Sequence, residues 1–167
     1  MMSVSIRNAG TTDIPVIRLL AEETWWPTYK PILEDEQIRY MLELIYSVDA
    51  LTTVMTQQTQ HFILLSDDEG AQGFAAYGPR ADEPVYKLHK LYVRPGNQGK
   101  GYGRRLLDEV VQRAKDQGIT TLDLNVNRYN PARSFYEKVG FSVLREEDIA
   151  IGPYWMNDYV MRRIVTP

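Results

Sequence analysis

One segment constrains the fold of this 167-residue chain more than any other. A strand-like stretch, Pro84 to Val93, runs into the glycine-rich segment 96–103, and helical spacing follows from Leu106 to Ala114. Glycines let backbone N–H groups converge on an anion without interference from Cβ, and a helix N-terminus adds positive potential. The same stretch carries four cations, Arg94, Lys100, Arg104 and Arg105. Together these features predict a site for a phosphate or pyrophosphate group.

Two common phosphate-binding motifs do not fit this segment. A Walker A loop needs Ser or Thr after Gly-Lys, whereas Gly101 follows Gly99-Lys100 here. A dinucleotide fingerprint needs Gly-x-Gly-x-x-Gly near the first strand of the fold, but the glycines at 99, 101 and 103 have another spacing and lie in mid-chain. Both motifs are therefore excluded.

A third motif does fit. The run from Gln98 to Gly103 resembles the Gln/Arg-x-x-Gly-x-Gly/Ala loop of the GNAT superfamily of acyl-CoA-dependent N-acyltransferases. Val93-Arg94-Pro95 resembles the Val-x-Pro exit from that family's fourth strand, and the segment from Asn130 to Phe141 resembles its second motif. One departure stands in the second motif: a single residue, rather than two, separates Asn130 from Ala132.

The resemblance covers about residues 3–165, and residues 84–141 carry its motifs. The stretch from Glu23 to Leu44 is also similar, more weakly, to the PaiA-like polyamine N-acetyltransferases. The resemblance implies an α/β, GNAT-like fold in one domain over residues 1–167, with a mixed central sheet of about six to seven strands and about four flanking helices.

The remaining elements follow from periodicity and from turn residues. Strict alternation over Pro84 to Val93 places Leu88 on one face with Lys90 and Tyr92, and His89 on the other with Leu91. The other expected strands are Val4–Asn8, His61–Leu65, Gly73–Tyr77, Thr121–Val126, Phe141–Leu144 and Tyr159–Val165. The other expected helices run from Thr11–Asp13 to about Trp25 or Trp26, with Pro27 and Pro31 as breaks, and begin near Glu34, Ser47 and Pro131.

Composition limits the chemistry. The chain has no cysteine, which excludes disulfides, thiolate metal sites and cysteine nucleophiles. No metal site is expected, because the two histidines, His61 and His89, have no ligand spacing. The net charge of −3 disfavours nucleic acid as a partner, and no apolar run approaches the roughly 20 residues that span a membrane. The segment Met1–Arg7 lacks an apolar signal core, so we expect a cytoplasmic protein.

The net charge conceals an asymmetry. Residues 1–93 contain 13 acidic and 7 basic side chains, whereas residues 94–167 contain 12 basic and 9 acidic ones. Surface scatter alone produces such differences, but here the basic half contains the glycine-rich segment. The split therefore predicts that the two halves contact ligands of opposite sign, CoA phosphates and a cationic amine.

The resemblance also implies a donor site for acetyl-CoA, the expected cosubstrate. The backbone of Leu91, Tyr92 and Val93 is expected to hydrogen-bond the pantetheine arm, and the amides of residues 98–103 to hold the pyrophosphate. The remaining candidate residues for acetyl-CoA are Gln98, Gly99, Lys100, Gly101, Tyr102, Gly103, Arg104, Asn130, Arg133 and Lys138.

Amide formation requires a neutral amine, and an amine with a pKa near ~10 is only about a thousandth neutral at pH 7. Tyr136 is the expected catalytic donor to the departing sulfur, and packing beside Phe135 is the less favoured alternative. His89 is the expected catalytic base, because a histidine pKa near ~6.5 suits proton transfer at neutral pH. A packed histidine, the poorer base Lys87 or a chain of water molecules are the alternatives. With no cysteine nucleophile, direct transfer without a covalent intermediate is expected.

The acceptor is expected among early aromatic and acidic residues. Trp25, Trp26 and Tyr29 could hold a cationic amine, or could equally belong to the core. Tyr154, Trp155 and Asp158 are similar candidates. The sequence thus predicts an N-acetyltransferase acting on a primary amine of a small molecule, with a polyamine favoured and a peptide or protein amine left open. A non-catalytic acyl-CoA-binding regulatory domain is the alternative, a DNA-binding regulator is disfavoured, and a homodimer is left open.

Overall fold

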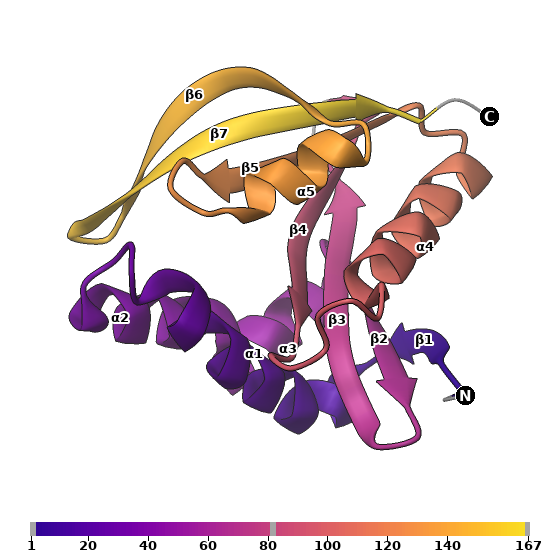
Figure 1. The fold of residues 1–167 in the computed structure, drawn as a ribbon, viewed down its shortest axis with the longest axis horizontal. Helices are drawn as coiled ribbons and strands as arrows, with labels where there is room; N and C mark the ends of the chain where they lie inside the picture. The colour runs from indigo at the N-terminus through magenta and orange to yellow at the C-terminus, as the bar shows by residue number, and fades with distance from the viewer. Residues whose placement is uncertain (1–2, 81–82, 166–167) are drawn as a thin grey trace.

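The computed structural model describes residues 3–80 and 83–165, in which seven strands form one mixed sheet (Figure 1). The strand order is β1-β2-β3-β4-β5-β7-β6. The strands are β1 (Ser5–Ala9), β2 (His61–Asp67), β3 (Gly70–Pro79), β4 (Tyr86–Val93), β5 (Thr121–Asn127), β6 (Ser142–Ile151) and β7 (Tyr154–Ile164). Neighbouring strands are antiparallel except β4 and β5, which are parallel.

Helices cover both faces of this sheet. A short 3-10 helix (Thr11–Asp13) precedes α1 (Ile14–Tyr29), α2 (Asp35–Tyr46), α3 (Val48–Thr56), α4 (Tyr102–Asp116) and α5 (Ala132–Lys138). Strand alternation divides the core: Ile63 and Leu65 pack in the cluster that contains α4 residues, while Phe62 and Leu64 pack with α1 to α3. The expected mixed α/β architecture is confirmed.

Helix α1 extends further than the sequence predicts. Pro27 lies inside it, and the helix ends only at Tyr29, so the expected break at Pro27 is wrong. Proline removes one backbone donor, but the surrounding bonds persist: the Lys30 N–H donates to the Trp26 carbonyl at 2.9 Å, and the Thr28 hydroxyl donates to the Thr24 carbonyl at 2.7 Å. Pro31 lies beyond the end of the helix, as expected.

Strands β6 and β7 are also longer than predicted and form a hairpin that reaches α2 (Figure 1). The Gln37 side chain on α2 donates to the Trp155 carbonyl at 2.8 Å. A Cβ on Gly152 would lie 2.1 Å from the Tyr40 hydroxyl, so this tip of the hairpin packs with its bare backbone against α2. Strand β6 is an exposed edge strand, and its charged run from Arg145 to Asp148 has no alternation of apolar and polar residues. The sequence therefore does not predict the full length of this strand.

A bulge at His89 changes the faces of β4. Lys90 pairs with Ala76, but Leu88 pairs with the next residue, Tyr77, so His89 is an extra residue in β4. Leu88 consequently packs in the same cluster as Leu91 and Val93, whereas Tyr92 packs with the opposite cluster. The expectation that Leu88 shares a face with Lys90 and Tyr92 is wrong for this reason.

Candidate active site

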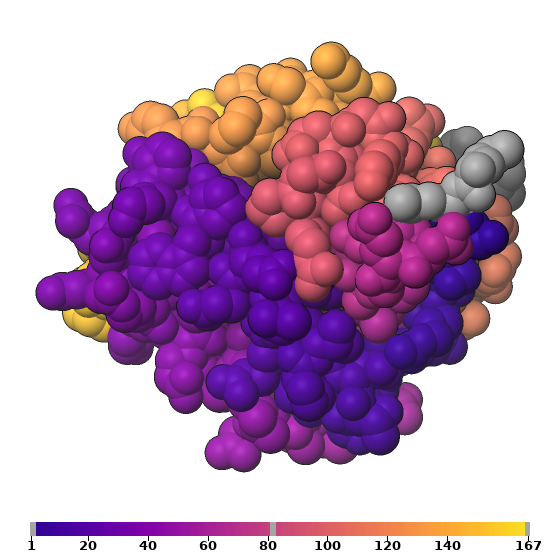
Figure 2. All heavy atoms as spheres, turned by 60° about the horizontal axis from the view of Figure 1, so that its bottom comes forward, coloured from indigo at the N-terminus to yellow at the C-terminus, as the bar shows by residue number. Residues whose placement is uncertain are grey.

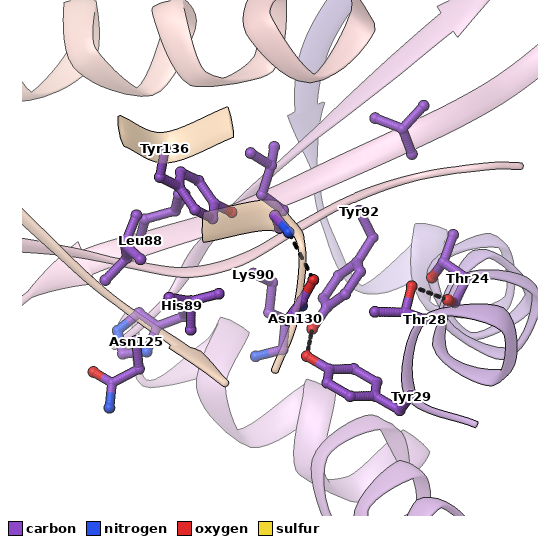
Figure 3. Close-up of a pocket in the computed structure, with 15 residues that line it drawn as sticks. Thr24, Thr28, Tyr29, Leu88, His89, Lys90, Tyr92, Asn125, Asn130 and Tyr136 are labelled. Carbon is purple, nitrogen blue, oxygen red and sulfur yellow. Dashed lines mark hydrogen bonds between the residues drawn. The ribbon is translucent and has the colours of Figure 1, made fainter. Parts of the chain in front are cut away.

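The two parallel strands at the centre of the sheet separate part of the way along. In the described chain, β4 pairs with β5 only from Tyr86 to Leu88. Beyond Leu88 lies an opening of about 200 Å³ between the two strands (Figure 3). Its lining comes from α1, β4, β5 and α5, and comprises Thr24, Thr28, Tyr29, Leu88, His89, Lys90, Leu91, Tyr92, Val93, Leu124, Asn125, Val126, Asn130, Ala132 and Tyr136.

The separation exposes one edge of β4. Leu91, Tyr92 and Val93 pair with β3 on one side, and on the other side they border the opening. Backbone N–H and C=O groups on such an edge can pair with an extended ligand as with an added strand. This geometry supports the binding role that the sequence analysis assigned to these three residues.

The glycine-rich turn leads from this edge into α4. Gly99 and Gly101 have φ values of 81° and 75°, in the left-handed region that glycine adopts without strain, and Gly101 is the N-cap of α4. Figure 2 shows the turn and the start of α4, in salmon, beside the indigo N-terminal helices and the magenta β2–β3 turn. This turn lies next to the opening, since a Cβ on Gly103 would be 3.9 Å from Val93, which lines it. The turn and the helix N-terminus have backbone N–H groups of the kind that an anion site requires.

A buried asparagine holds the turn in place. The Asn97 amide, 8% exposed, donates to Gln72 Oε1 at 2.9 Å and to the Arg94 carbonyl at 3.0 Å. Its Oδ1 accepts from Lys100 Nζ at 3.0 Å. The sequence analysis missed Asn97, and its position between the Val-x-Pro exit and the glycines is the only signal that could have found it.

Several candidate side chains in this turn have protein partners. The Tyr102 hydroxyl donates to Asp67 Oδ2 at 2.7 Å, so this side chain anchors α4 to the β2–β3 turn. Gln98 accepts from the Gly96 N–H at 3.0 Å, and Arg104 forms an exposed ion pair with Asp108 at 3.2 Å. The turn therefore offers its backbone and its exposed cations, whereas Tyr102 and Gln98 chiefly shape it.

The second motif begins with Asn130, whose Oδ1 accepts from the Ala132 N–H at 2.9 Å at the start of α5. Asn130 lines the opening together with Tyr29 and Tyr92. The Tyr29 hydroxyl lies 3.0 Å from the Tyr92 hydroxyl (Figure 3). Asn130 and this pair of tyrosines thus form part of the wall of the opening.

The two basic side chains of the second motif, Arg133 and Lys138, have surroundings other than the opening. The Arg133 guanidinium lies 4.6 Å from the Tyr159 ring centre, and its Nε forms an ion pair with Glu137 at 3.2 Å. Lys138 is exposed at the C-terminal end of α5. Neither side chain lines the opening in the part of the chain that the structure describes.

Tyr136 lines the opening and is 8% exposed (Figure 3). Its ring packs edge-on against Phe135 and Phe141, with ring centres 5.3 and 5.7 Å away. Burial raises the pKa of this phenol, and the interaction with Tyr29 raises it further, so the hydroxyl stays protonated at neutral pH. Tyr136 therefore both packs in the core and presents a proton donor to the opening.

His89, at the bulge, also lines the opening. Burial lowers its pKa to about 3, and the charges of Lys87, Lys90 and Arg80 act in the same direction. The imidazole is therefore neutral at pH 7 and holds an added proton weakly. This environment reduces its strength as a base.

Of the three aromatic acceptor candidates, the structure brings only Tyr29 to the opening. Trp25 is 3% exposed, and its indole N–H donates to the Tyr46 hydroxyl at 3.3 Å within the cluster formed by α1 to α3. Trp26 lies on another surface of α1, where its indole donates to Glu22 at 2.9 Å and Arg39 lies over its ring.

A second cavity of about 540 Å³ continues from the opening towards the glycine-rich turn. It shares Thr24, Thr28, Val93, Asn130 and Ala132 with the opening. Its other lining residues come from the end of α1 and the loops after β4 and β5, and are Pro27, Pro31, Ile32, Pro95, Gln98, Tyr129 and Pro131. The two cavities together extend from Gln98 in the glycine-rich turn to Tyr136.

Within residues 3–80 and 83–165, no group of three or more His, Cys, Asp or Glu side chains could hold a metal ion. Nor is any helix there long and apolar enough to cross a membrane.

A mixed sheet whose parallel strands separate beside a glycine-rich turn agrees with the acetyltransferase fold that the sequence motifs imply. The chain belongs to the GNAT family, since the family described as "Acetyltransferase (GNAT) domain" matches residues 29–156. The membership expected from the two sequence motifs is thereby confirmed.

Individual relatives agree with this membership. The chain is 31% identical over 147 residues to a spermidine N(1)-acetyltransferase from Thermoplasma acidophilum, covering 85% of this chain and 90% of the relative. It is 29% identical over 153 residues to an uncharacterised N-acetyltransferase from Mycobacterium tuberculosis, covering 91% and 97%. The crystal structure of the PaiA N-acetyltransferase from T. acidophilum in complex with coenzyme A superimposes with a TM-score of 0.83 at 29% identity, covering 97% of this chain and 99% of that one.

Proposed function

We propose that this protein transfers the acetyl group of acetyl-CoA directly to a primary amine of a small molecule. The observation that carries the proposal is the path from the left-handed turn at Gly99 and Gly101, along the open edge of β4, to Tyr136. That path matches an extended ligand with an anionic end and a reactive end, and the related PaiA enzyme was crystallised with coenzyme A.

The residues present suit such a donor. The N–H groups of the turn and of the first turn of α4 would hold the pyrophosphate, with Lys100 and Arg104 as nearby cations. The backbone of Leu91 to Val93 would pair with the pantetheine arm, whose apolar part suits the prolines of the second cavity. Acetyl-CoA supplies the acetyl group as a thioester.

Tyr136 would donate its hydroxyl proton to the departing sulfur. A phenol pKa near ~10 exceeds that of a thiol near ~8.5, and burial of Tyr136 widens this gap. Proton donation therefore has to accompany breakage of the C–S bond. The phenol regains a proton from the nitrogen as the C–N bond forms and the amide becomes neutral.

The acceptor is a primary amine, with a polyamine favoured. The favoured class is supported by the spermidine-acetylating relative and by the acidic N-terminal half of the chain. Tyr29 reaches the opening from α1 and offers a hydroxyl and an aromatic ring to a cation.

The test is release of CoA from acetyl-CoA by the purified protein with a panel containing spermidine, simple alkylamines, amino acids and peptides with free N-termini. We expect amine-dependent CoA release, and acetylated product by mass spectrometry. Binding of acetyl-CoA without transfer to any amine would instead favour the non-catalytic regulatory alternative.

A further inference from the structure

A buried carboxylate lies behind the opening, on β7. Asp158 is 6% exposed and pairs in register with Asn127 on β5 and with Glu147 on β6. Its Oδ2 accepts from the Asn125 amide at 3.3 Å. Its Oδ1 is buried and has no hydrogen-bond partner in the described part of the chain. An unpaired buried carboxylate oxygen is costly, and its retention calls for an explanation.

Asp158 is connected to the opening through its partner. Asn125, which holds Oδ2, lines the opening together with His89 (Figure 3). Asn125 and Asn127 alternate with the core residues Leu124 and Val126, so both project from the face of β5 opposite α4. The carboxylate thus lies one side chain away from the space where an acceptor would meet the thioester.

Charged and titratable groups interact with Asp158 from several elements. Lys87 on β4 and Arg128 after β5 favour its charged form, whereas Glu147 on β6 disfavours it. The negative charge of Asp158 in turn contributes to the raised pKa of Tyr29 on α1. Burial outweighs the favourable contacts and raises the pKa of Asp158 above its usual value. A carboxylate in this state accepts a proton more readily than an exposed one, and more readily than His89 with its pKa of about 3.

Resting on the proposed function, we infer that Asp158 receives the proton of the acceptor ammonium group, past Asn125, directly or across one water molecule. The ammonium loses one proton to the Asp158 carboxylate, and the resulting neutral nitrogen forms a bond to the thioester carbon. The C–S bond breaks, the thiolate takes its proton from Tyr136, and Tyr136 recovers one from the nitrogen. Asp158 then releases its proton to solvent, so that one ammonium and one thioester give an amide, a thiol and one proton.

The experiment compares wild type with Asp158→Asn on two amines. Spermidine is protonated at pH 7, whereas 2,2,2-trifluoroethylamine is largely neutral because fluorine withdraws electrons from its nitrogen. We expect kcat/KM for spermidine to fall about 100-fold in the variant, the usual contribution of a general base. For trifluoroethylamine we expect a fall of less than about 5-fold, because no proton has to be removed first. In the variant only the neutral amine reacts, so the acid limb of the spermidine pH profile should move up towards the pKa of the amine itself, about 10.

Controls separate this role from a structural one. Glu147→Gln removes a carboxylate next to Asp158 in register. It should leave kcat/KM for both amines at pH 7 within about 2-fold and move the acid limb to lower pH, because Glu147 disfavours the charged form of Asp158. Acetyl-CoA binding by calorimetry and the thermal unfolding midpoint report whether Asp158→Asn folds. Equal losses on both amines, or an unchanged acid limb, would overturn the inference while the proposed function stood. Wild-type inactivity towards every amine would overturn the proposed function, and the inference with it.

Discussion

Asp123 and Asp158 are both buried carboxylates on the same face of the sheet. Asp123 lies in the closed half of the β4–β5 junction, where the two strands pair, and Asp158 lies towards the open half, where they have separated. Asp123 stands opposite Lys87, where the strands still pair, and it bonds Arg80 at 2.8 Å and Arg162 at 2.7 and 2.9 Å. Asp158 lies behind Asn125, which lines the opening, and among the described residues one of its oxygens has no hydrogen-bond partner. The closed half satisfies its carboxylate fully, and the open half does not.

The two pKa shifts follow this difference. Burial alone would raise the pKa of Asp123, but hydrogen bonds and charges from Arg162 and Arg80 bring it below its usual value. Asp158 has no arginine on its carboxylate, and burial raises its pKa. A buried acid with full partners stabilises a fold, whereas one without them is available for proton transfer. The comparison assigns stability to the closed half and chemistry to the open half.

The largest expected effect on stability comes from Asp123→Asn. It leaves the guanidinium groups of Arg80 and Arg162, each about a third exposed, without their counter-charge. We expect a loss of about 2–3 kcal/mol in unfolding free energy, against less than about 1 kcal/mol for Asp158→Asn, measured by urea denaturation at pH 7. Similar losses from the two variants would contradict the division between the halves.

The same pair gives a pH test with a defined sign. Because folding lowers the pKa of Asp123, its contribution is complete above the ordinary carboxylate pKa of ~4 and is lost as pH falls through the folded-state value. The stability difference between wild type and Asp123→Asn should therefore be constant from pH 6 to 8 and shrink under acid conditions. A constant difference at all pH values would show that packing, not charge, is lost.

Tyr136→Phe tests the chemistry of the open half. The change removes one hydroxyl but keeps the ring contacts with Phe135 and Phe141. We expect kcat to fall about 100-fold, equivalent to about 2.7 kcal/mol of transition-state stabilisation, with little change in acetyl-CoA affinity. Stopped-flow turnover and calorimetric binding measure the two quantities. Unchanged turnover would leave Tyr136 a packing residue alone.

His89→Gln should alter stability more than it alters the kinetic pH profile. Folding lowers the pKa of His89 to about 3 from an ordinary value near ~6.5, so wild type loses stability as pH falls through that interval. We expect the variant to lack this loss, gaining about 1–2 kcal/mol over wild type between pH 7.5 and pH 5. If the pH–rate profile of wild type showed a pKa near 6.5 that was absent from the profile of the variant, His89 would instead be the base.

The smallest expected effect comes from Gly101→Ala. The backbone at this position has φ 75°, which costs a residue with a side chain about 1 kcal/mol. No atom lies within 4 Å of the added Cβ, so the cost is conformational rather than steric. We expect acetyl-CoA binding to weaken about 5-fold as the turn relaxes, measured by calorimetry, with Gly118→Ala, past the end of α4, as a control for the same φ region.

The sequence predicted the elements that local chemistry determines. The glycine-rich turn and the helix after it follow from short-range rules. In the structure, Gln98 of the turn and Tyr136 line two adjoining cavities. The sequence did not predict Asp158 as a partner of Asn125, because these residues lie 33 positions apart and meet only through pairing of β5 with β7. It left open whether Trp25 lies in the core or at a binding surface, since an aromatic residue on a helix has the same pattern in both, and the structure buries it.

The bulge at His89 gives β4 one residue more than its pairing with β3 requires. Deleting His89 would remove the bulge and leave Leu88 and Lys90 on opposite faces, as they are now, with Leu88 still in the core in which it packs. A deletion or insertion elsewhere in β4 would instead invert the faces of all residues on one side of the change. Among changes in length between Tyr86 and Val93, the strand should therefore tolerate loss of His89 best.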